Sequence, residues 1–426
     1  MRAIKPDIVI AGAGPAGMMA AIRAGQLGRS VLLLERNPSC GRKLLLSGKG
    51  RCNLANACPR EEFFSKFSGQ GAFLRDALDK FYYPELTAFF EERGLEMSVE
   101  RQGRIFPSCG GSADVLRVLL SEMDSLGVKI NYNCRVRGIE TGGGSVRRVI
   151  LEDSGSIAAE RVILACGGVS YAFTGSVGDG QEMARALGHT VSPLLPALAP
   201  LRTVKTYPAL KGLLLKNVRV SVSFVNRGKK RRLDSPVGEV AFHSRGIGGA
   251  LVLSLSGRVS RLLAEGARAR LEIDLKPGLE RGVLDSRLLR EFKAGPHSGL
   301  EDILCALMPE QLAAVFCSVC GLPAGKKANQ ITAAERGRIL DCLKCFFFDI
   351  EGVSMDEAMV TCGGVSLKQI NPRTMESRLV KGLYFAGEMI DLDADTGGFN
   401  LQAAFSTGYL AGESAASRKT GETDGK

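Results

Sequence analysis

The first hydrophobic positions form two short apolar runs with a segment of helical periodicity between them. Asp7–Ala11 and Ser30–Glu35 each predict a short buried strand, and Pro15–Leu27 carries apolar residues at helical spacing. A strand, a helix and a second strand at this spacing predict a βαβ unit, which is the usual opening of a nucleotide-binding sheet. The sequence therefore favours an α/β fold from its first 35 residues.

The rest of the chain alternates between helical and strand periodicity. The predicted helices are 61–94, 180–187, a stretch from about 284 to 345, and 400–415. The predicted strands are 128–139, 147–151, 161–165, 218–224, 237–242, 270–274 and 383–386. No internal repeat is visible, and a polar tail ends the sequence.

A change of character divides the chain into segments. Prolines at 193, 196 and 200 precede a region that is β-rich first and helical second, and sheet character resumes near Glu351. We expect a first cofactor-domain segment over 1–192, an inserted domain over 193–350 that covers the cofactor, and a second cofactor-domain segment over 351–426. The predicted fold is thus an α/β Rossmann-type domain assembled from both ends of the chain.

Composition narrows the class of protein. The chain has 426 residues, 45% of them hydrophobic and 24% charged, which excludes a largely disordered chain. No apolar run approaches the roughly 20 residues that span a bilayer, so no membrane association is expected. Twelve cysteines without a visible cleavable signal favour free thiols in a reducing cytoplasm.

The formal net charge of +11 leaves two interpretations open. A solubilising surface charge is one, and an anionic partner such as RNA is the other. The densest basic run is predicted to decorate a hairpin turn and consists of Arg227, Lys229, Lys230, Arg231 and Arg232. No aromatic residue interleaves this run, so nucleic acid is not the favoured partner.

The first chemical motif is a glycine-rich turn between the first strand and the first helix. Residues 12–17 read Gly-Ala-Gly-Pro-Ala-Gly, the G-x-G-x-x-G pattern of dinucleotide-binding sites. Its glycines permit a tight turn, close approach of a pyrophosphate, and close packing of helix on strand. Glu35 ends the second strand, where a ribose-binding carboxylate is expected.

Two later segments favour FAD over NAD as the bound dinucleotide. Residues 162–168 form an apolar strand ending in Ala-Cys-Gly-Gly, similar to the A-T-G-G strand of flavoproteins with two dinucleotide-binding domains. Residues 382–388, Gly-Leu-Tyr-Phe-Ala-Gly-Glu, resemble the C-terminal strand whose acid meets the ribityl or pyrophosphate part of FAD in those proteins. A dehydrogenase that binds only NAD has no reason to carry this pair.

Two long motifs resemble one family specifically. They are residues 41–53 (GRKLLLSGKGRCN) and 391–402 (DLDADTGGFNLQ), the latter followed by AAFSTG at 403–408. The chain resembles the BaiN-type (YhiN-like) flavoproteins, often called the aminoacetone oxidase family of FAD-binding enzymes. Arg104–Pro107 and 365–372 also fit, so the resemblance covers nearly the whole chain. It implies an oxidoreductase with FAD bound by both ends of the chain.

The resemblance has two departures. The insert loop of the family ends in Ser-Gly-Pro, whereas 242–250 here does not, so no substrate contact is assigned to that loop. Cys166 replaces the threonine of A-T-G-G. From the motifs and the resemblance together, the expected cofactor-binding residues are Gly12, Ala13, Gly14, Pro15, Ala16, Gly17, Glu35, Arg36, Lys43, Ser47, Gly50, Arg51, Asn53, Val136, Ala165, Gly167, Gly387, Glu388, Gly398, Asn400, Leu401 and Gln402.

The glycine turn at 397–402 suits the redox end of a flavin. Reduced flavin gains negative charge at N1 and O2, and N–H groups at a helix N-terminus stabilise such charge. The simpler interpretation is an ordinary N-terminus capped by Asn400. Lys43 and Arg51 would steady the pyrophosphate or face the flavin edge, unless they are plain surface charges.

The cysteines and histidines suggest no second chemistry. Two C-x-x-C pairs, Cys317/Cys320 and Cys342/Cys345, have zinc-like spacing but lie in apolar helical stretches, so no metal is expected. Cys52 lacks a partner at disulfide-reductase spacing and is expected to pack in the core. Of the three scattered histidines, only His243 is a candidate proton donor, and no catalytic residue is assigned.

The sequence thus predicts an FAD-dependent oxidoreductase acting on an unidentified small molecule. Only one G-x-G-x-x-G is present, so NAD(P)H would act as a transient donor rather than a resident cofactor. Two alternatives stay open: a flavin-dependent protein that modifies or binds RNA, and a flavin-binding sensor without catalytic activity.

Overall fold

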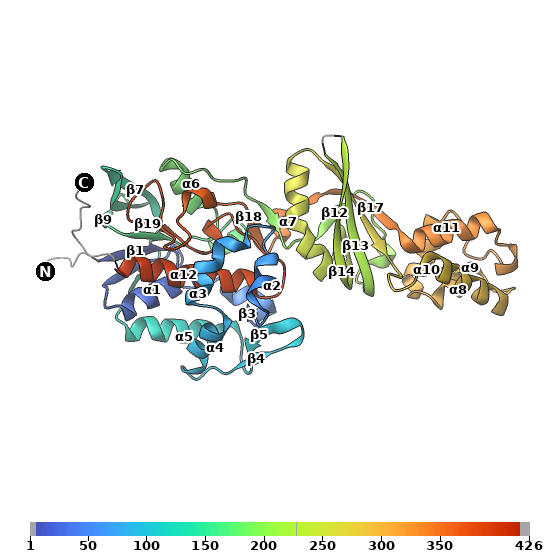
Figure 1. Ribbon diagram of the computed structural model, residues 1–426, viewed down its shortest axis with the longest axis horizontal. Helices are drawn as coiled ribbons and strands as arrows, with labels where there is room; N and C mark the ends of the chain where they lie inside the picture. The colour runs from blue at the N-terminus through green and yellow to red at the C-terminus, as the bar shows by residue number, and fades with distance from the viewer. Residues whose placement is uncertain (1–5, 227, 418–426) are drawn as a thin grey trace. The chain divides into compact units, whose positions relative to one another are not determined.

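The computed structural model describes residues 6–226 and 228–417. The chain folds into two compact units, of which the first combines Met1–Leu195 with Met359–Lys426 and the second is Pro196–Ala358. Figure 1 colours the first unit in blue to green and again in red, because both ends of the chain build it. The polar tail at 418–426 and Arg227 lie outside the described residues.

The centre of the first unit is a parallel sheet of five strands within the described residues, in the order β19-β10-β1-β2-β6. Its strands are β1 (Ile8–Ala11), β2 (Val31–Leu34), β6 (Lys129–Asn131), β10 (Val162–Leu164) and β19 (Leu383–Phe385). β1 and β10 are apolar and fully buried, as expected for strands covered on both faces. Ile163 of β10 pairs with Ile10 of β1 on one side and with Tyr384 of β19 on the other. The sheet therefore joins the two ends of the chain.

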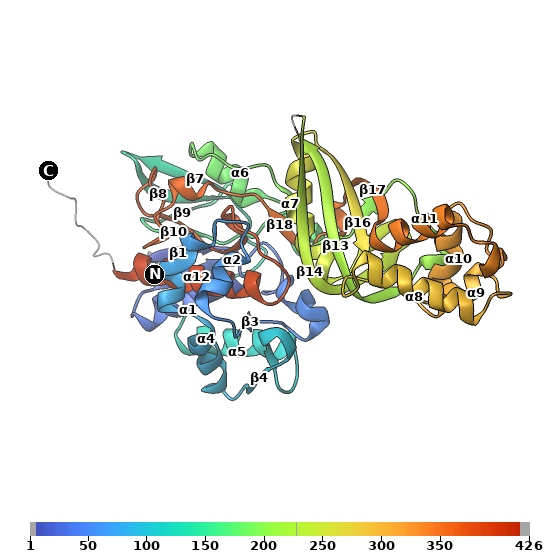
Figure 2. The same ribbon diagram turned by 45° about the vertical axis from the view of Figure 1, so that its right-hand side comes forward.

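Two helices from opposite ends of the sequence pack together against this sheet. Figures 1 and 2 both show α1 (Pro15–Gln26) beside α12 (Phe399–Ser417). A Cβ at Gly408 would lie 2.2 Å from the Ala16 carbonyl oxygen, and one at Gly412 would lie 2.4 Å from that of Ala20. Only glycine fits at these two contacts, so the backbones of α12 and α1 come close together. Through Ala16, this contact brings α12 against the glycine-rich turn.

Smaller elements complete the first unit. Its helices are α2 (Arg60–Ser65), α3 (Arg75–Lys80), α4 (Tyr83–Glu91), α5 (Ser112–Ser125) and α6 (Asp179–Ala186). Two small antiparallel sheets are built from β3 (Ala55–Asn56), β5 (Arg104–Pro107) and β4 (Met97–Val99), and from β7 (Val136–Gly142), β8 (Ser145–Leu151) and β9 (Ser156–Ala158). β18 (Val360–Cys362) follows the return of the chain to this unit.

The second unit contains a closed barrel, in the order β12-β15-β14-β13-β16-β17 over the described residues. The strands are β12 (Leu201–Thr203), β13 (Leu214–Asn226), β14 (Lys229–His243), β15 (Gly246–Gly248), β16 (Arg268–Asp274) and β17 (Phe346–Val353); β11 (Leu195–Ala197) precedes them. Its helices are α7 (Ala250–Ala264), α8 (Arg281–Ala294), α9 (Leu300–Cys305), α10 (Glu310–Val319) and α11 (Ala333–Lys344). Figure 1 shows α8–α11 grouped at one end of the barrel.

The unit boundaries lie at 195/196 and 358/359, a few residues after the expected 192/193 and 350/351. The second shift has a clear cause, since β17 closes the barrel by pairing with β16 and β12 and runs past 350 to Val353. The basic run expected at a hairpin turn lies mostly in a strand, since Lys229 to Arg232 are the first residues of β14. No helix among the described residues is long and apolar enough to cross a membrane.

Candidate functional site

The glycine-rich turn leaves open space at one of its glycines only. Gly12 has φ +101°, and a Cβ there would lie 2.5 Å from the Ala165 carbonyl oxygen. A Cβ at Gly17 would lie 1.9 Å from the Gly12 carbonyl oxygen. A Cβ at Gly14 would meet nothing within 4 Å. Gly12 and Gly17 are therefore required by the protein's own packing, whereas the space beside Gly14 is free for a ligand.

Glu35 fastens this turn to the end of β2. Its side chain is buried, and Oε2 accepts a hydrogen bond of 2.9 Å from the Ala13 backbone N–H. Oε1 accepts from the backbone N–H of Asn37 at 2.9 Å and from its side-chain amide at 2.7 Å. The carboxylate is thus held by three donors beside the turn, at the place where the sequence predicts ribose binding.

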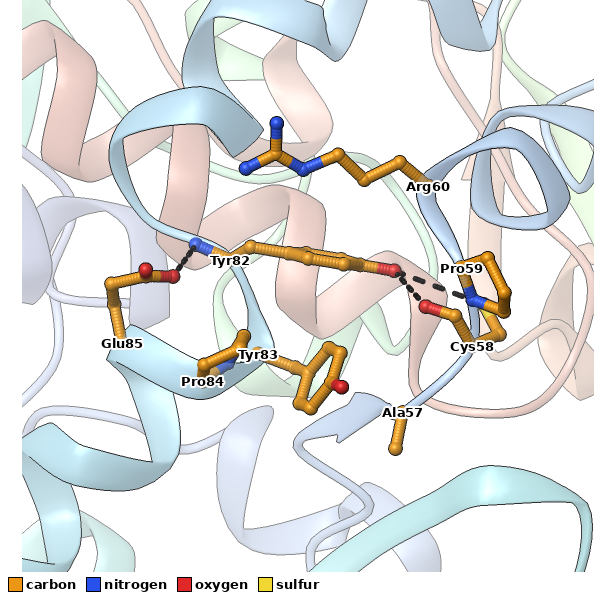
Figure 3. A pocket seen from close by; sticks show the side chains of 8 residues that line it. All are labelled: Ala57, Cys58, Pro59, Arg60, Tyr82, Tyr83, Pro84 and Glu85. Atoms are coloured by element: carbon orange, nitrogen blue, oxygen red, sulfur yellow. Dashed lines mark hydrogen bonds between the residues drawn. The ribbon is translucent and has the colours of Figure 1, made fainter.

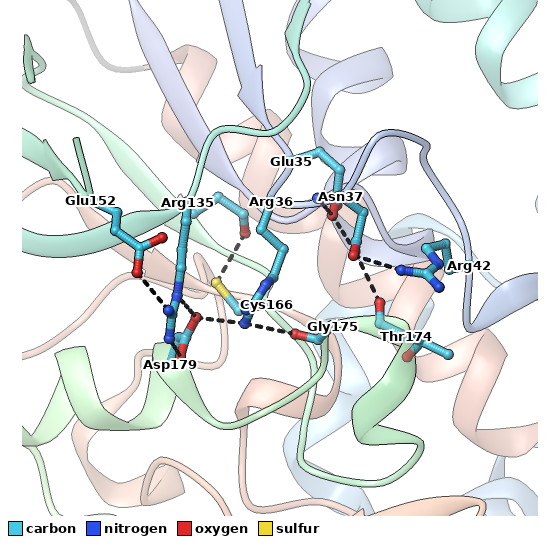
Figure 4. Close-up of polar contacts among 11 residues, drawn as sticks. Glu35, Arg36, Asn37, Arg42, Arg135, Glu152, Cys166, Thr174, Gly175 and Asp179 are labelled. Atoms are coloured by element: carbon cyan, nitrogen blue, oxygen red, sulfur yellow. Dashed lines mark hydrogen bonds and ion pairs between the residues drawn. The ribbon is translucent and has the colours of Figure 1, made fainter.

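A network of charged side chains surrounds Glu35 (Figure 4). Arg36 Nη1 lies 3.0 Å from Asp179 Oδ2, and Arg135 binds both Asp179 oxygens at 2.8 Å. Arg135 Nη1 also lies 2.7 Å from Glu152 Oε1. Val136, next to Arg135, is buried at the start of β7. The network links the ends of β2, β7 and α6.

Lys43 and Glu388 form a second charged cluster. Lys43 Nζ lies 2.6 Å from Glu388 Oε2 and donates to Ser170 Oγ at 2.7 Å. The other Glu388 oxygen accepts from the Thr361 backbone N–H at 2.6 Å. Gly387 is positioned for this by Thr407, whose hydroxyl accepts the Gly387 N–H at 2.9 Å. The two motifs at 41–53 and 382–388 therefore meet, through Lys43 and Glu388.

The motif residues between Lys43 and Asn53 form a tight loop. Ser47 Oγ donates to the Leu44 carbonyl at 2.6 Å, and Gly50 has φ +86°. Arg51 turns outward, pairs with Glu100 and stacks 4.3 Å from the Phe106 ring centre. Cys52 turns inward with φ +61° and is fully buried, and burial raises the pKa of its thiol to about 12. Cys52 is thus a packed thiol.

The Gly397–Gly398 turn is held by two asparagines. The Asn53 amide, oriented to satisfy its neighbours, accepts from the Gly398 N–H at 3.1 Å and donates to the Ala55 and Ile105 carbonyls. Asn56 Nδ2 donates to the Gly397 carbonyl at 3.0 Å. A Cβ at Gly398 would lie 2.2 Å from the Ala55 carbonyl oxygen, and its φ is +95°. The turn therefore lies directly against β3.

The residues after this turn take three different roles. Asn400 does not cap its helix: its side chain accepts from the Ala394 N–H and donates to the Ala394 carbonyl, each at 3.0 Å. Gln402 is fully buried and its amide nitrogen donates to Phe81 O at 3.3 Å and Ser406 Oγ at 2.9 Å. The first N–H groups of α12 lack intrahelical partners, as at any helix start, so those of Phe399, Asn400 and Leu401 are the donors that this helix offers a ligand.

The strand expected to return to the cofactor is β10, which is buried and pairs with β1. The backbone N–H of Ala165 donates to the Ala11 carbonyl at 2.9 Å, and Gly167 has φ +75°. Gln181 is fully buried and donates to the Gly167 carbonyl at 2.8 Å. Burial also raises the pKa of Cys166 to about 12, so this replacement for threonine stays a thiol beside Ala11.

The cysteines of the second unit form no metal cluster among the described residues, where no group of three or more histidine, cysteine or carboxylate side chains is arranged around a common point. The Cys320 thiol donates to that of Cys342, which raises the pKa of Cys320 and lowers that of Cys342. Burial raises the pKa of Cys317 to about 11. His243 is exposed on β14, and its role as a proton donor stays a prediction.

One pocket of about 370 Å³ includes Ala57, which directly follows β3 in the chain (Figure 3). Its other lining residues are Cys58, Pro59, Arg60, Tyr82, Tyr83, Pro84 and Glu85. The Tyr82 hydroxyl donates to the Cys58 carbonyl at 2.8 Å, and Glu85 accepts the Tyr82 N–H at 3.0 Å. Most polar groups of this pocket are therefore engaged with one another.

The predicted residues form three groups in the first unit: Gly14 and Glu35 at the glycine-rich turn, Lys43 with Glu388, and the Gly398 turn with Asn53 and Asn56. A family model described as "HI0933-like protein Rossmann domain" matches residues 6–414. The chain belongs to this family. The match confirms the family resemblance, the Rossmann-type fold and the assignment as an FAD-dependent oxidoreductase.

Curated relatives match nearly the whole chain. A protein of Clostridium scindens named "3-dehydro-bile acid delta(4,6)-reductase" is 33% identical over 96% of this chain and 99% of its own length. Proteins named "Ribosomal RNA dihydrouridine synthase" are 29% identical in Haemophilus influenzae, over 94% of this chain and 96% of the relative, and 28% identical in Escherichia coli, over 97% and 99%.

Solved structures share the fold at low identity. A quinol-fumarate reductase matches with a TM-score of 0.52 and 19% identity, covering 100% of this chain and 73% of that one. A 3-ketosteroid delta1-dehydrogenase from Sterolibacterium denitrificans matches with a TM-score of 0.50 and 12% identity, covering 98% and 100%. These matches support the α/β architecture with an insert.

The residues present fit FAD. Open space at Gly14, a buried carboxylate at Glu35 and donors at the start of α12 are the three features that a bound dinucleotide flavin requires. The Gln402 amide donates to Phe81 O in the core and the Asn53 amide accepts the Gly398 N–H, and the contacts of both residues with the flavin stay predictions. The sequence analysis did not single out four polar residues of these clusters: Asp179, Arg135, Ser170 and Thr361. Only Asp179 could have been noticed from the sequence, because it lies between Gly178 and Gly180.

Proposed function

We propose that this protein is an FAD-dependent reductase that adds hydrogen across a carbon–carbon double bond conjugated with a carbonyl group of a small molecule. The observation that carries the proposal is the 33% identity, over almost the full length of both chains, to a protein named as a delta(4,6)-reductase of a 3-dehydro-bile acid. Dihydrouridine also arises by reduction of a double bond conjugated with a carbonyl. The names of these three relatives are therefore consistent with one reaction type.

The chain's own residues would bind and orient the cofactor. Reduced FAD, when bound, would supply a hydride, which carries both electrons, and the second hydrogen would reach the substrate as a proton. Gly14 leaves room for its pyrophosphate, and Glu35 is placed to accept from ribose hydroxyls. Lys43 and Glu388 hold the middle of the site, and the N-terminus of α12 favours negative charge at the flavin edge. The electron donor in this proposal is NAD(P)H, which binds transiently.

A substrate panel tests the reaction type. Protein loaded with FAD is mixed with NADH or NADPH and a series of cyclic enones, with the corresponding saturated ketones as controls. We expect nicotinamide oxidation that requires an enone, and a product two mass units heavier than the substrate. Nicotinamide oxidation that proceeds equally with saturated ketones, or no reduction of any enone, would contradict the proposal.

RNA is the second candidate substrate, because the excess positive charge lies in the second unit. Residues 196–358 contain 25 lysines and arginines against 17 aspartates and glutamates. Phosphate contacts would make binding strongly dependent on salt. RNA retention that is lost between 50 and 200 mM salt, with dihydrouridine formed in the retained RNA, would favour this candidate; reduction of small enones alone would favour the first.

The proposed compartment is the reducing cytoplasm. No disulfide joins any of the twelve cysteines, all of which lie in the described part of the chain, and three of those in the first unit, Cys40, Cys52 and Cys58, are buried thiols. Proteins that keep this many thiols reduced usually work inside the cell.

A further inference from the structure

The segment between β10 and α6 is tied down at both ends by groups of the cofactor site. At its start, the Thr361 hydroxyl accepts the backbone N–H of Val169 at 2.8 Å and that of Ser170 at 3.1 Å. Ser170 Oγ also accepts from Lys43 Nζ at 2.7 Å. The start of the segment is thus part of the Lys43–Glu388 cluster.

Its far end is tied to the residues that follow Glu35 (Figure 4). Asn37 Nδ2 donates to the Thr174 carbonyl at 2.9 Å, and Arg36 Nη1 donates to the Gly175 carbonyl at 3.3 Å. Asp179 then holds Arg36 and Arg135. The segment therefore connects the Glu388 cluster with the residues that hold Glu35.

Between these two anchors the segment carries two aromatic rings, of which Tyr171 is half-buried and Phe173 is exposed. Tyr171 has φ +54°, which is uncommon for a residue with a side chain, and Phe173 is 67% exposed. Their ring centres are 5.8 Å apart with the planes nearly perpendicular. A single exposed aromatic needs no explanation. A left-handed tyrosine and an exposed phenylalanine in a segment fixed at both ends suggest a surface that a ligand covers.

We propose that Tyr171 and Phe173 form an adenosine-binding subsite, in which the rings pack on the adenosine half of bound FAD. The adenosine half is the occupant because the ring-bearing residues adjoin Thr174 and Gly175, which are bound by Asn37 and Arg36 beside the ribose carboxylate Glu35. The flavin half is assigned to the other end of the site, at the Gly398 turn. The inference needs FAD binding alone, so it is independent of the substrate proposed above.

The test compares Phe173→Ala with the matched control Val177→Ala. Val177 is another exposed apolar residue of the same segment, 41% exposed, and neither substitution removes a buried contact. Full-length protein stripped of flavin is titrated with FAD and, separately, with ADP, which carries the adenosine half without the flavin. The melting temperature of each stripped variant checks that the fold is intact.

We expect Phe173→Ala to weaken FAD and ADP binding by a similar factor, roughly tenfold, and Phe173→Leu to restore part of it, since the lost contact is apolar area. Val177→Ala should change neither affinity by more than about twofold. Weaker FAD binding with unchanged ADP binding would place the ring on the flavin half and overturn the inference. Unchanged affinity for both ligands would also overturn it. This includes the case in which Phe173 packs against a second copy of the chain, so that its loss changes the oligomeric state and not the affinity.

Discussion

At the Glu35 end of the site, charged and amide side chains hold one another, whereas at the Gly398 end the chain presents backbone held by two asparagines. The Asn37 amide donates to Glu35 at 2.7 Å, and Arg36 donates to Asp179 at 3.0 Å. Gly397 and Gly398 are joined to Asn56 and Asn53 instead. The difference teaches that affinity for the dinucleotide and tuning of the flavin are assigned to separate parts of the chain.

The largest expected effect is at the Glu35 end. Gly14→Glu places a carboxylate in the free space beside the turn, where the pyrophosphate is expected, and like charges in contact cost several kcal/mol. FAD affinity should fall by roughly a thousandfold or more. Equilibrium dialysis against FAD measures it. Gly14→Ala is the control, because a Cβ there meets nothing within 4 Å, and an equal loss in both variants would contradict the assignment.

The second largest effect is expected at the ion pair between Lys43 and Glu388. Glu388→Gln leaves Lys43 without its carboxylate partner in a part-buried cluster, so we expect a loss of about 1–3 kcal/mol in the free energy of unfolding, measured by urea titration. Glu100→Gln breaks the exposed pair with Arg51 and should leave stability unchanged within error. Equal effects of the two substitutions would show that Glu388 is no more than a surface partner.

At the Gly398 end we expect a change of potential with a smaller effect on affinity. Gly398→Ala must move backbone, because its Cβ would lie 2.2 Å from the Ala55 carbonyl oxygen. If the start of α12 faces the flavin, displacing it lowers the two-electron potential by roughly 20–40 mV. A spectral redox titration of FAD-loaded protein measures this, with Gly14→Ala as the control. An unchanged potential would remove the Gly398 turn from the redox end.

The smallest effect concerns His189, which joins the end of α6 to the loop before β19. Its Nδ1–H donates to the Ala184 carbonyl at 3.2 Å, its Nε2 lies 2.7 Å from Ser377 Oγ, and burial lowers its pKa below 6.5. The unfolded chain therefore binds a proton that the folded chain does not. Stability should fall as the pH drops below about 6.5, by at most about 1.4 kcal/mol per pH unit.

Urea midpoints at pH 7.5 and pH 5.5 check the His189 prediction. His189→Gln should flatten the dependence on pH, whereas His297→Gln, at an exposed position, should retain it. A wild-type protein that is more stable at pH 5.5 than at pH 7.5, with the difference removed in His189→Gln, would reverse the sign and contradict the account.

Local sequence patterns predicted the parts of the molecule that depend on local chemistry. Gly12 to Gly17 and the strand at 162–165 could be read directly, because a glycine turn and an apolar strand are properties of a few consecutive residues. Asp179 and Arg135 could not, since their contact joins residues 44 positions apart through side chains. The partners of Gln402 could not be predicted for a related reason: its motif indicates the start of α12 but not that the Gln402 amide donates to Phe81 O.

The barrel shows the same limit on a larger scale. Alternating residues predicted β13 and β16, but closure depends on β17 pairing with β12, more than 140 residues earlier in the chain. The end of the insert was therefore predicted too early.

The most direct test of the account is the flavin content of the purified wild-type protein. The released cofactor is identified by mass spectrometry after denaturation, and its amount is compared with that of the chain. We expect a yellow protein that releases FAD, close to one per chain, and no FMN. A colourless protein that cannot be reconstituted with FAD would contradict the account at its centre.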